Sequence, residues 1–416
     1  MTNLGHPAQR VRKLMLYSHD TYGLGHLRRN LRIASHLLRA AAGLRIVLAT
    51  GSPVASYFPL PPGLTIVKLP SVRKVGAGEY QPLDSRVGIG LIRRTRTAVM
   101  RDVVRRFHPD VLLVDHSPAG MNGELLGVFD AVRDHSPGTR VVLGLRDILD
   151  DPAAVIRAWT EQGIYQVIEE AYGQVVVYGC QDVFDVGDSY GLPGRVRDRL
   201  VYCGYLEPAA TGEPPAGDAG IRYPRPYLLA TAGGGGDGVV ALTGAIEAGR
   251  VLGLRTIAVT GPLIGDRESE TLAAVAARAG GVELVRFHPH LQSAMAAAAA
   301  VVTMGGYNSL CEAVAAAVPT VVVPRHHPRL EQAIRARLFA ERGLVRVAEP
   351  GPGLGRRIAR AVTAGAAPAL QSIDFRGLDR LAHVLLGEPR GRGAGVFRHP
   401  APRRATGEEL ADRRPA

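Results

Sequence analysis

Short apolar runs alternate with helical patterns along this chain of 416 residues, and this alternation limits the possible folds more than any other feature. The apolar runs have the length and branched-residue content of buried strands, whereas the segments between them repeat apolar residues every three or four positions. Strands that alternate with helices form parallel sheets covered on both faces. We therefore predict an α/β fold. In the first half of the chain, strands are expected at residues 13–18, 45–50, 64–69, 111–115, 140–145, 175–178 and 200–203.

A stretch rich in proline, glycine and alanine interrupts the alternation at residues 207–220. This composition is typical of a linker between domains. The alternation then restarts, and the chain is longer than one compact core usually takes. Strands of the second half are expected at residues 227–231, 256–260, 282–286, 300–303 and 320–323. We predict an N-terminal domain over residues 11–206, a linker over 207–220, a C-terminal domain over 221–386 and a disordered tail over 387–416.

The net charge of +12 comes almost entirely from arginine, since lysine occurs only at positions 13, 68 and 74. A basic surface attracts nucleic acid and anionic lipid. The sequence, however, contains no zinc finger, no RNP aromatic residues and no convincing helix-turn-helix. Nucleic acid is therefore not an expected partner.

Targeting and metal signals are also missing from the sequence. No apolar run reaches the roughly 18 residues of a membrane-spanning helix. The N-terminus lacks the apolar core and cleavage site of a signal peptide, so we expect a cytoplasmic protein. Cys180, Cys203 and Cys311 lie far apart and form no metal-ligand pattern. We expect buried, reduced thiols and no metal site.

Residues 301–333 carry two loops, each of which follows an apolar strand. In the first loop, Gly305 and Gly306 let a ligand approach the backbone, and the free N–H groups of the next helix favour an anion such as a diphosphate. Asn308 or Ser309 is expected to cap this helix. Glu312 is expected in its first turn, where the carboxylate can accept hydrogen bonds from ribose hydroxyls. The alternative is a tight turn with a glutamate that stabilises the helix dipole.

The second of these loops ends in Glu331 and Gln332. Ligands of open parallel sheets lie at the carboxyl ends of the strands, so both loops are expected at one site.

A further glycine-rich loop, residues 231–238, contains Gly234 and Gly235. Consecutive glycines lose much chain entropy on folding, which favours a role in close approach to a ligand. The loop lacks the lysine of a P-loop, and a flexible loop without a ligand is the alternative.

The order of these features resembles the C-terminal donor domain of GT-B glycosyltransferases, and of family 28 in particular, over about residues 225–345. The resemblance implies two Rossmann-like, doubly wound domains that face a central cleft, with a nucleotide sugar bound by the C-terminal domain. It assigns the diphosphate to Gly234, Gly235, Gly305, Gly306, Asn308 and Ser309. It assigns the ribose to Glu312, the sugar to Glu331 and Gln332, and the base to Phe287 and His288 at another strand end.

The N-terminal half has its own glycine-bearing loop after the first strand, residues 19–28. Arg28 stands where a dinucleotide fingerprint has its third glycine, which disfavours an NAD site, and no cofactor is expected. The resemblance implies that Gly23, Gly25 and His26 face the donor across the cleft. A histidine with a near-neutral pKa is suited to deprotonate an acceptor hydroxyl. A helix-capping or structural role for His26 is the alternative.

Other polar residues follow strands of the first half. Asp115 is either a second candidate base or a partner for His26. His116 follows in a polar loop that we expect on the acceptor side. Asp150 and Asp151 precede a proline, so helix capping is expected there rather than metal binding. The resemblance likewise implies that no metal is required.

Together with these observations, the resemblance implies an inverting, metal-independent transfer of a hexose or N-acetylhexosamine from a UDP-type nucleotide sugar to an acceptor hydroxyl. One alternative is an enzyme similar to UDP-N-acetylglucosamine 2-epimerase, which would share the donor loops. Another is a non-catalytic GT-B-like binding subunit. The acceptor is left open, and the resemblance makes a lipid-linked acceptor one option.

The helical pattern at residues 89–107 bears on that option. Arg94, Arg101 and Arg105 lie opposite an apolar stripe. A basic amphipathic helix can rest on an anionic membrane, which would place the protein at the inner face of the membrane. A solvated face over a core stripe is the more common arrangement. The stripe is expected to consist of Ile92, Val99, Val103 and Phe107.

Overall fold

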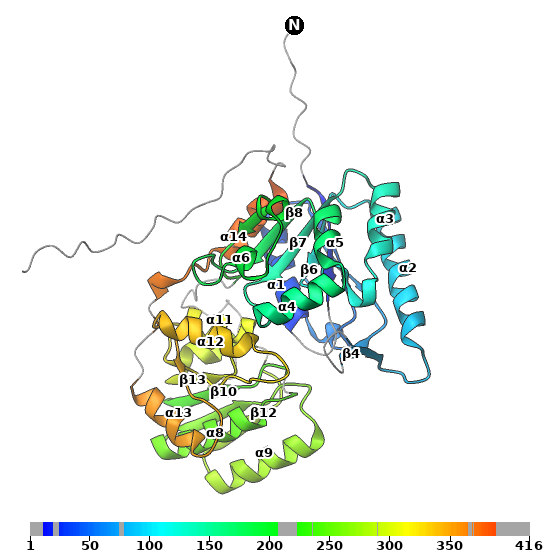
Figure 1. Cartoon of the computed structure of the whole chain (residues 1–416). Coiled ribbons are helices and arrows are strands. Elements are labelled where there is room, and N and C mark those ends of the chain that lie inside the picture. Colours follow the sequence, from blue (N-terminus) through cyan, green and yellow to red (C-terminus); the bar gives the residue numbers. More distant parts are fainter. Residues whose placement is uncertain are drawn as a thin grey trace, which may run out of the picture.

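The computed structural model describes residues 11–19, 25–74, 79–206, 223–234, 236–288, 290–364, 368 and 370–387. Within these ranges the chain folds into two α/β domains that face each other (Figure 1). Gly23, Gly235, the expected linker at 207–220 and residues 388–416 of the expected tail lie outside the described residues. No helix in the described ranges is both long and apolar enough to cross a bilayer.

The first domain contains a seven-stranded parallel sheet in the order β3-β2-β1-β6-β7-β8-β9, as far as the described residues show. Its strands are β1 (Lys13–Ser18), β2 (Arg45–Thr50), β3 (Leu64–Lys68), β6 (Val111–Asp115), β7 (Arg140–Arg146), β8 (Gln174–Tyr178) and β9 (Leu200–Tyr202). Every residue of β6 is buried, as expected for a central strand with helices on both sides. A short antiparallel pair, β4 (Val72–Lys74) and β5 (Tyr80–Pro82), stands apart from this sheet.

Helices cover the first sheet. They are α1 (Gly25–Ala40), α2 (Ile89–Phe107), α3 (Leu126–His135), α4 (Pro152–Glu161), α5 (Ile164–Ala171) and the short α6 (Val186–Ser189) and α7 (Gly194–Arg197). Helix α4 begins as the sequence predicts, because Asp151 is its N-cap and accepts a hydrogen bond from the Ala154 N–H at 3.1 Å.

The second domain repeats this architecture with a parallel sheet in the order β12-β11-β10-β13-β14-β15. Its strands are β10 (Tyr227–Thr231), β11 (Arg255–Val259), β12 (Val282–Val285), β13 (Ala300–Thr303), β14 (Thr320–Val322) and β15 (Arg346–Val347). The connecting helices are α8 (Val239–Leu252), α9 (Asp266–Ala279), α10 (Leu291–Ala297), α11 (Tyr307–Ala315), α12 (Glu331–Glu341) and α13 (Leu354–Thr363). The expected strands are present, and the two-residue β15 was too short to be predicted.

In both sheets the strand order reverses beside the first strand. β1 pairs with both β2 and β6, and β10 pairs with both β11 and β13. At such a switch point the connections leave to opposite faces, so a crevice opens at the carboxyl ends of the two central strands. The two crevices face each other, and the loops named from the sequence lie around them.

The last helix, α14 (Gly377–Leu386), packs against α1 of the first domain (Figure 1). His36 on α1 forms an ion pair with Asp379 at 3.1 Å. The apolar face of α14, including Leu381 and Leu385, is buried in the core that surrounds α1. The predicted C-terminal domain at 221–386 is therefore too long at its end. The apolar pattern of α14 predicts a buried face but not which domain covers it.

Helix α2 is exposed at Arg94, Arg101 and Arg105, as predicted, but its core stripe lies elsewhere. The fully buried positions are Arg96, Met100 and Val104, while Ile92, Val99, Val103 and Phe107 are only partly buried. The reason is a buried ion pair: Arg96 donates to Glu124 at 2.6 and 2.8 Å. Cys180, Cys203 and Cys311 are reduced and buried, as expected.

Candidate functional site

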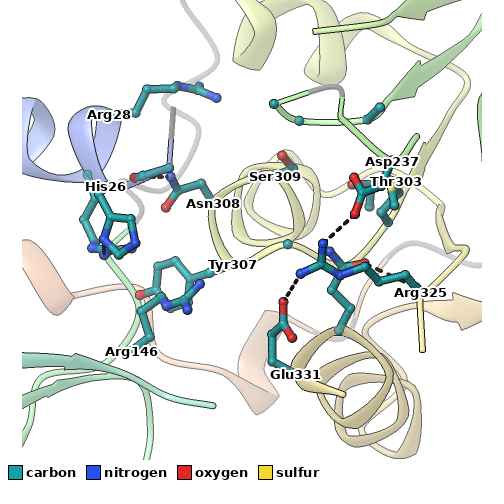
Figure 2. A pocket seen from close by; sticks show the side chains of 18 residues that line it. His26, Arg28, Arg146, Asp237, Thr303, Tyr307, Asn308, Ser309, Arg325 and Glu331 are labelled. Carbon is teal, nitrogen blue, oxygen red and sulfur yellow. Dashed lines mark hydrogen bonds and ion pairs between the residues drawn. The ribbon is translucent and has the colours of Figure 1, made fainter. Parts of the chain in front are cut away.

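A cavity of about 270 Å³ lies between the two domains, at the carboxyl ends of both sheets. Figure 2 shows His26 and Arg146 on one side of it, with Asp237, Arg325 and Glu331 opposite. The first domain contributes Gly25, His26, Arg28, Arg29 and Arg146. The second contributes Ala232, Gly233, Gly234, Asp237, Thr303, Met304, Gly306, Tyr307, Asn308, Ser309, Arg325, Glu331 and Gln332.

The N-terminus of α11 points its backbone into this cavity. Gly306 is the N-cap, and no side chain caps the helix, so the expectation that Asn308 or Ser309 caps it is wrong. The first intrahelical bond runs from Leu310 N–H to Gly306 C=O at 2.9 Å. The preceding N–H groups of the helix have no intrahelical acceptor and carry the positive end of the helix dipole. They form the part of the cavity best suited to a diphosphate.

Asn308 is used differently from the prediction. Its Nδ2 donates to the Gly25 C=O at 2.9 Å, so it connects α11 to the start of α1 across the cleft. Its Oδ1 is buried and has no partner among the described residues. Asn308 therefore presents one free acceptor to the cavity and positions two helix starts next to each other.

Glu312 lies in the second turn of α11, not the first, because the helix begins at Tyr307. Its Oε1 accepts from Arg28 at 2.5 Å and from Arg32 at 2.9 Å, both on α1 of the other domain. Its Oε2 is buried, and within the described residues it has no hydrogen-bond partner. A buried carboxylate oxygen without a donor is costly, so a ligand hydroxyl at this position would be bound favourably.

Two loops beside the cavities require glycine at one position each. Gly305 has φ of 83°, and a Cβ there would lie 3.0 Å from Val322 Cγ1. Gly261, after β11, has φ of 89°, and a Cβ there would lie 2.6 Å from the Gly233 carbonyl oxygen. The loop that contains Gly233 and Gly234 is therefore packed closely against the next strand end.

Glu331 and Gln332 begin α12 and are both buried beside the cavity. Arg325 donates to Glu331 Oε1 at 2.7 Å and also forms an ion pair with Asp237. Gln332 Oε1 accepts from the Arg325 backbone N–H at 3.3 Å. Glu331 Oε2 has no partner in the described part of the chain. The pair thus offers free acceptor and amide groups at the place where the resemblance puts the sugar.

A second, smaller cavity of about 40 Å³ adjoins the first and is lined by Phe287 and His288. Phe287 is 41% exposed, whereas His288 is buried. The first domain reaches this cavity through Phe58, whose ring lies edge-on to Phe287 with centroids 6.2 Å apart. An exposed ring beside a narrow cavity is suited to stack on a nucleotide base.

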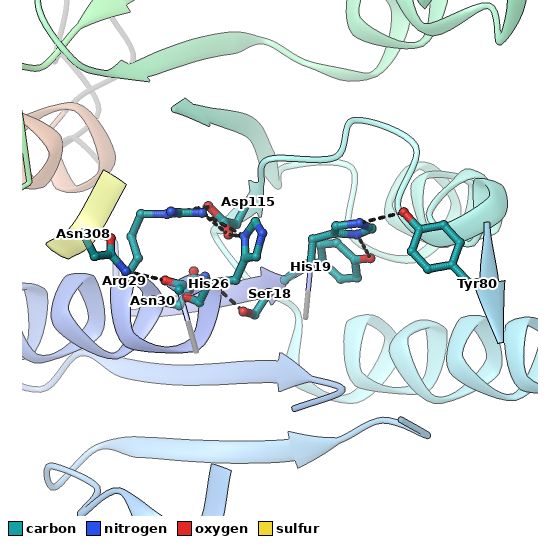
Figure 3. Close-up of polar contacts among 10 residues, drawn as sticks. Ser18, His19, His26, Arg29, Asn30, Tyr80, Asp115 and Asn308 are labelled. Carbon is teal, nitrogen blue, oxygen red and sulfur yellow. Dashed lines mark hydrogen bonds and ion pairs between the residues drawn. The ribbon is translucent and has the colours of Figure 1, made fainter. Parts of the chain in front are cut away.

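His26 and Asp115 meet at the first domain's side of the main cavity (Figure 3). His26 Nδ1 lies 2.6 Å from Asp115 Oδ2, and Arg29 donates to Asp115 Oδ1 at 2.8 and 3.0 Å. Burial raises the pKa of Asp115, but Arg29 and His26 lower it more, so the pKa lies well below its usual value and the group is a carboxylate. Arg29 Nη2 also lies 2.9 Å from His26 Nδ1, but it donates to both oxygens of Asp115. The shorter contact of Nδ1 is with the ionised Asp115, which can only accept, so the His26 proton is assigned to Nδ1 and the Nε2 lone pair can act as a base.

The environment of His26 favours its neutral form. Burial lowers its pKa below 6.5, and the positive charges of Arg29 and Arg146 act in the same direction. Asp115 opposes them, but the net shift is downward. A neutral imidazole at physiological pH is the state that a general base requires.

Two more histidines lie beside His26. The ring of His116 has its centroid 5.0 Å from that of His26, and burial together with Arg146 lowers the pKa of His116 far below 6.5. His19 lies between Tyr17 and Tyr80 at 3.2 and 3.1 Å. Since the Tyr17 hydroxyl donates to Glu124, it accepts from His19 Nδ1, and His19 Nε2 is left to accept from Tyr80. Of the three histidines only His26 lines the main cavity, and His116 and His19 lie behind it.

The sequence reasoning missed three arginines of this cavity: Arg29, Arg146 and Arg325. Arg29 lies three positions after His26 on one helix, a spacing that puts both on one face. Arg146 is the last residue of β7, and Arg325 follows β14 closely. The strand-end rule that selected Asp115 applies equally to these two.

No metal cluster accompanies these groups. In the described ranges, no three His, Cys, Asp or Glu side chains converge so that they could hold a metal ion.

Comparison with known proteins agrees with this arrangement. Residues 257–371 match the glycosyltransferase family 28 C-terminal domain. None of the curated proteins matches the sequence significantly. Among solved structures, a calicheamicin glycosyltransferase aligns with a TM-score of 0.55 at 18% identity, over 90% of this chain and 94% of the other.

Two further structures align equally well. MurG of Acinetobacter baumannii has a TM-score of 0.54 at 14% identity, over 90% of this chain and 98% of the other. UGT89C1 of Arabidopsis thaliana, solved with UDP, has a TM-score of 0.54 at 15% identity, over 90% and 94%. The prediction of a GT-B glycosyltransferase that resembles family 28 is confirmed: the chain has the two-domain GT-B fold and a family 28 C-terminal domain.

Proposed function

We propose that the chain transfers a hexose or N-acetylhexosamine from a UDP-type nucleotide sugar to an acceptor hydroxyl, with inversion and without a metal. One observation supports this most strongly. The unsatisfied N-terminus of α11 and the His26–Asp115 pair open onto the same cavity from opposite domains. An anionic leaving group and a base are thus available on the two sides of one space.

In this proposal the donor lies along the second domain. The diphosphate contacts the N–H groups at the start of α11 and the loop of Gly233 and Gly234. The ribose hydroxyls donate to Glu312 Oε2, and the base stacks beside Phe287. The sugar reaches Glu331 and Gln332. The UDP in the UGT89C1 structure supports UDP as the first donor nucleotide to test.

The chemical step is a single displacement. The acceptor oxygen forms a bond to the anomeric carbon while the bond from that carbon to the diphosphate oxygen breaks, so the configuration inverts. The acceptor proton passes to His26 Nε2, and Asp115 stabilises the imidazolium that forms. The α11 N–H groups, with Arg28 and Arg325 at the cavity wall, offset the charge that develops on the leaving diphosphate.

The experiment that tests this function is a turnover screen on the full chain. Purified protein is incubated with UDP-, GDP- and ADP-sugars, with and without EDTA, and release of nucleoside diphosphate is followed with and without candidate acceptors, including lipid-linked ones. Acceptor-dependent, EDTA-insensitive release of UDP supports the proposal. Release of free epimerised sugar from the donor alone would instead indicate an epimerase. If the protein binds UDP but shows no turnover, or if turnover is the same in a His26→Ala variant, a binding subunit would be indicated.

Substitution Glu312→Gln is expected to weaken UDP binding about 10-fold or more, because hydrogen bonds to a charged acceptor are worth about 1.5–3 kcal/mol. Isothermal titration calorimetry with UDP measures the effect. Glu341→Gln is a matched control, since Glu341 pairs only with exposed Arg337 in the described contacts. Equal UDP affinity in the Glu312→Gln protein would contradict the assignment of the ribose to this residue.

The pH dependence follows from the lowered pKa of His26. We expect kcat/KM to be at its plateau at pH 7 and to fall on the acid side with an apparent pKa below 6.5, as the imidazole becomes protonated. Arg146→Gln removes a positive charge that lowers this pKa, so the acid limb should move to higher pH. A pH–rate profile measures both. An acid limb above pH 7 in the unmodified protein would be incompatible with His26 as the base.

A further inference from the structure

Arg146 differs from the other arginines of the cavity because no carboxylate holds it. Arg29 pairs with Asp115, Arg28 with Glu312, and Arg325 with Asp237 and Glu331. Among the described residues, Arg146 forms no ion pair or side-chain hydrogen bond, and its buried Nε has no partner. Figure 2 shows its side chain at the cavity wall near Tyr307, on the same side as His26.

The charge on Arg146 is nevertheless maintained. Burial lowers its pKa to about 10, and the nearby positive charges of Arg29, Arg335 and Arg329 contribute to this shift. A group with this pKa is still protonated at pH 7. The negative charge of Glu331 acts on Arg146 from nearby, but no carboxylate in the described part of the chain bonds to it directly. The free protein therefore keeps a cation at the wall of its site that a bound anion would stabilise.

Arg146 lines the same cavity as the start of α11 but belongs to the first domain, on the side of His26. It ends β7 in the first domain and acts electrostatically on His116 and His26. Arg329, which precedes α12, also lowers the pKa of His116 and of Arg146. Arg329 Nε lies 3.8 Å from Asp150 Oδ2. Two arginines, one on the first domain's side and one at the start of α12, thus act on the histidine next to His26.

We propose that Arg146, with Arg329 beside it, binds a carboxylate or phosphate group of the acceptor. A guanidinium presents parallel N–H donors that match either anion. This inference rests on the proposed function, since it takes the donor diphosphate to occupy the start of α11. It restricts the acceptor to molecules that carry an anionic group close to the hydroxyl that is glycosylated.

The test uses the full chain saturated with UDP and three small probes: phenyl phosphate, benzoate and the neutral benzamide. Ligand-observed NMR titration gives their affinities. We expect one or both anions to bind in preference to benzamide. Arg146→Gln should weaken the anion about 10-fold or more, Arg146→Lys should weaken it less, and the matched control Arg94→Gln, on the exposed face of α2, should have no effect.

Stability provides a second readout. Because Arg146 has no described carboxylate partner, Arg146→Gln should have a Tm no lower than that of the unmodified protein, whereas loss of a structural arginine would lower it. Equal anion affinity in Arg146→Gln, or failure of both anions to bind the unmodified protein, would overturn the proposal.

Two further results would show that Arg146 binds the nucleotide sugar and not the acceptor. One is an equal loss of UDP affinity in Arg146→Gln. The other is an Arg146-dependent preference for UDP-glucuronate over UDP-glucose. If UDP does not bind at all, the proposed function fails, but the anion titration without UDP still tests the Arg146 site.

Discussion

Replacement of His26 by alanine is expected to lower the rate of sugar transfer by about 10²- to 10⁴-fold, the usual contribution of a general base. The structure gives the physical reason. Asp115 Oδ2 lies 2.6 Å from His26 Nδ1 and accepts the proton that this nitrogen carries. Burial lowers the pKa of the imidazole, so Nε2 is an available base at neutral pH. UDP affinity should change far less than the rate, because in the proposed function His26 takes the acceptor proton and the diphosphate is held by the N–H groups of α11.

The control is His36→Ala, on the same helix but paired with Asp379 of α14 outside the cavity. Initial rates under saturating donor, together with UDP titration, separate chemistry from binding. A His26→Ala protein that retains more than about a tenth of the rate would show that the imidazole does not take the proton.

The second large effect concerns stability. Asp147→Ala is expected to lower the free energy of unfolding by about 3–5 kcal/mol, because it leaves a buried arginine uncompensated. Arg335 on α12 is fully buried and donates to both oxygens of Asp147, at 2.8 to 3.2 Å. The same guanidinium donates to the carbonyls of Gly305 and Ile148 at 3.0 Å. The ion pair therefore joins the end of β7 to the donor loop of the second domain.

Urea unfolding, followed by circular dichroism, measures this loss. Asp102→Ala, which breaks an exposed pair with Arg106, should change the free energy by less than about 1 kcal/mol. In the double variant Asp147→Leu with Arg335→Leu, no buried charge is left, so much of the stability should return. A loss below about 1 kcal/mol for Asp147→Ala would show that water or rearrangement compensates Arg335.

The sequence predicts the sheets and the strand-end loops well because both depend on local patterns. The alternation of apolar runs and helices requires parallel sheets, and the carboxyl ends of such sheets bring His26, Asp115 and the loop of Gly305 to one edge in each domain. Glu331 and Gln332 were found by the same rule. These predictions needed no knowledge of how the domains meet.

Contacts between the domains could not be predicted in this way. Arg28 and Glu312 are 284 residues apart in the chain, and Arg335 and Asp147 are 188 apart. Neither pair has a local signal, because an arginine on a helix face is more commonly solvated. The return of α14 to the first domain was missed for the same reason: periodicity identifies an apolar face but not the surface that covers it.

Capping was also misjudged at α11. Asn308 has the side chain of an N-cap, but the helix already begins at Tyr307 with Gly306 as its cap. The amide is used instead to bind Gly25 of the other domain. As a result the helix start is left without a side-chain cap, which is the condition for a ligand to occupy it.

A crystal structure of the full chain with UDP tests the account most directly. We predict that the diphosphate contacts the backbone N–H groups at the start of α11, that a ribose hydroxyl donates to Glu312 Oε2, and that the base lies beside Phe287. The β-phosphate should face the side of the cavity that holds His26. UDP bound elsewhere, or bound with Glu312 Oε2 still without a donor, would contradict the account.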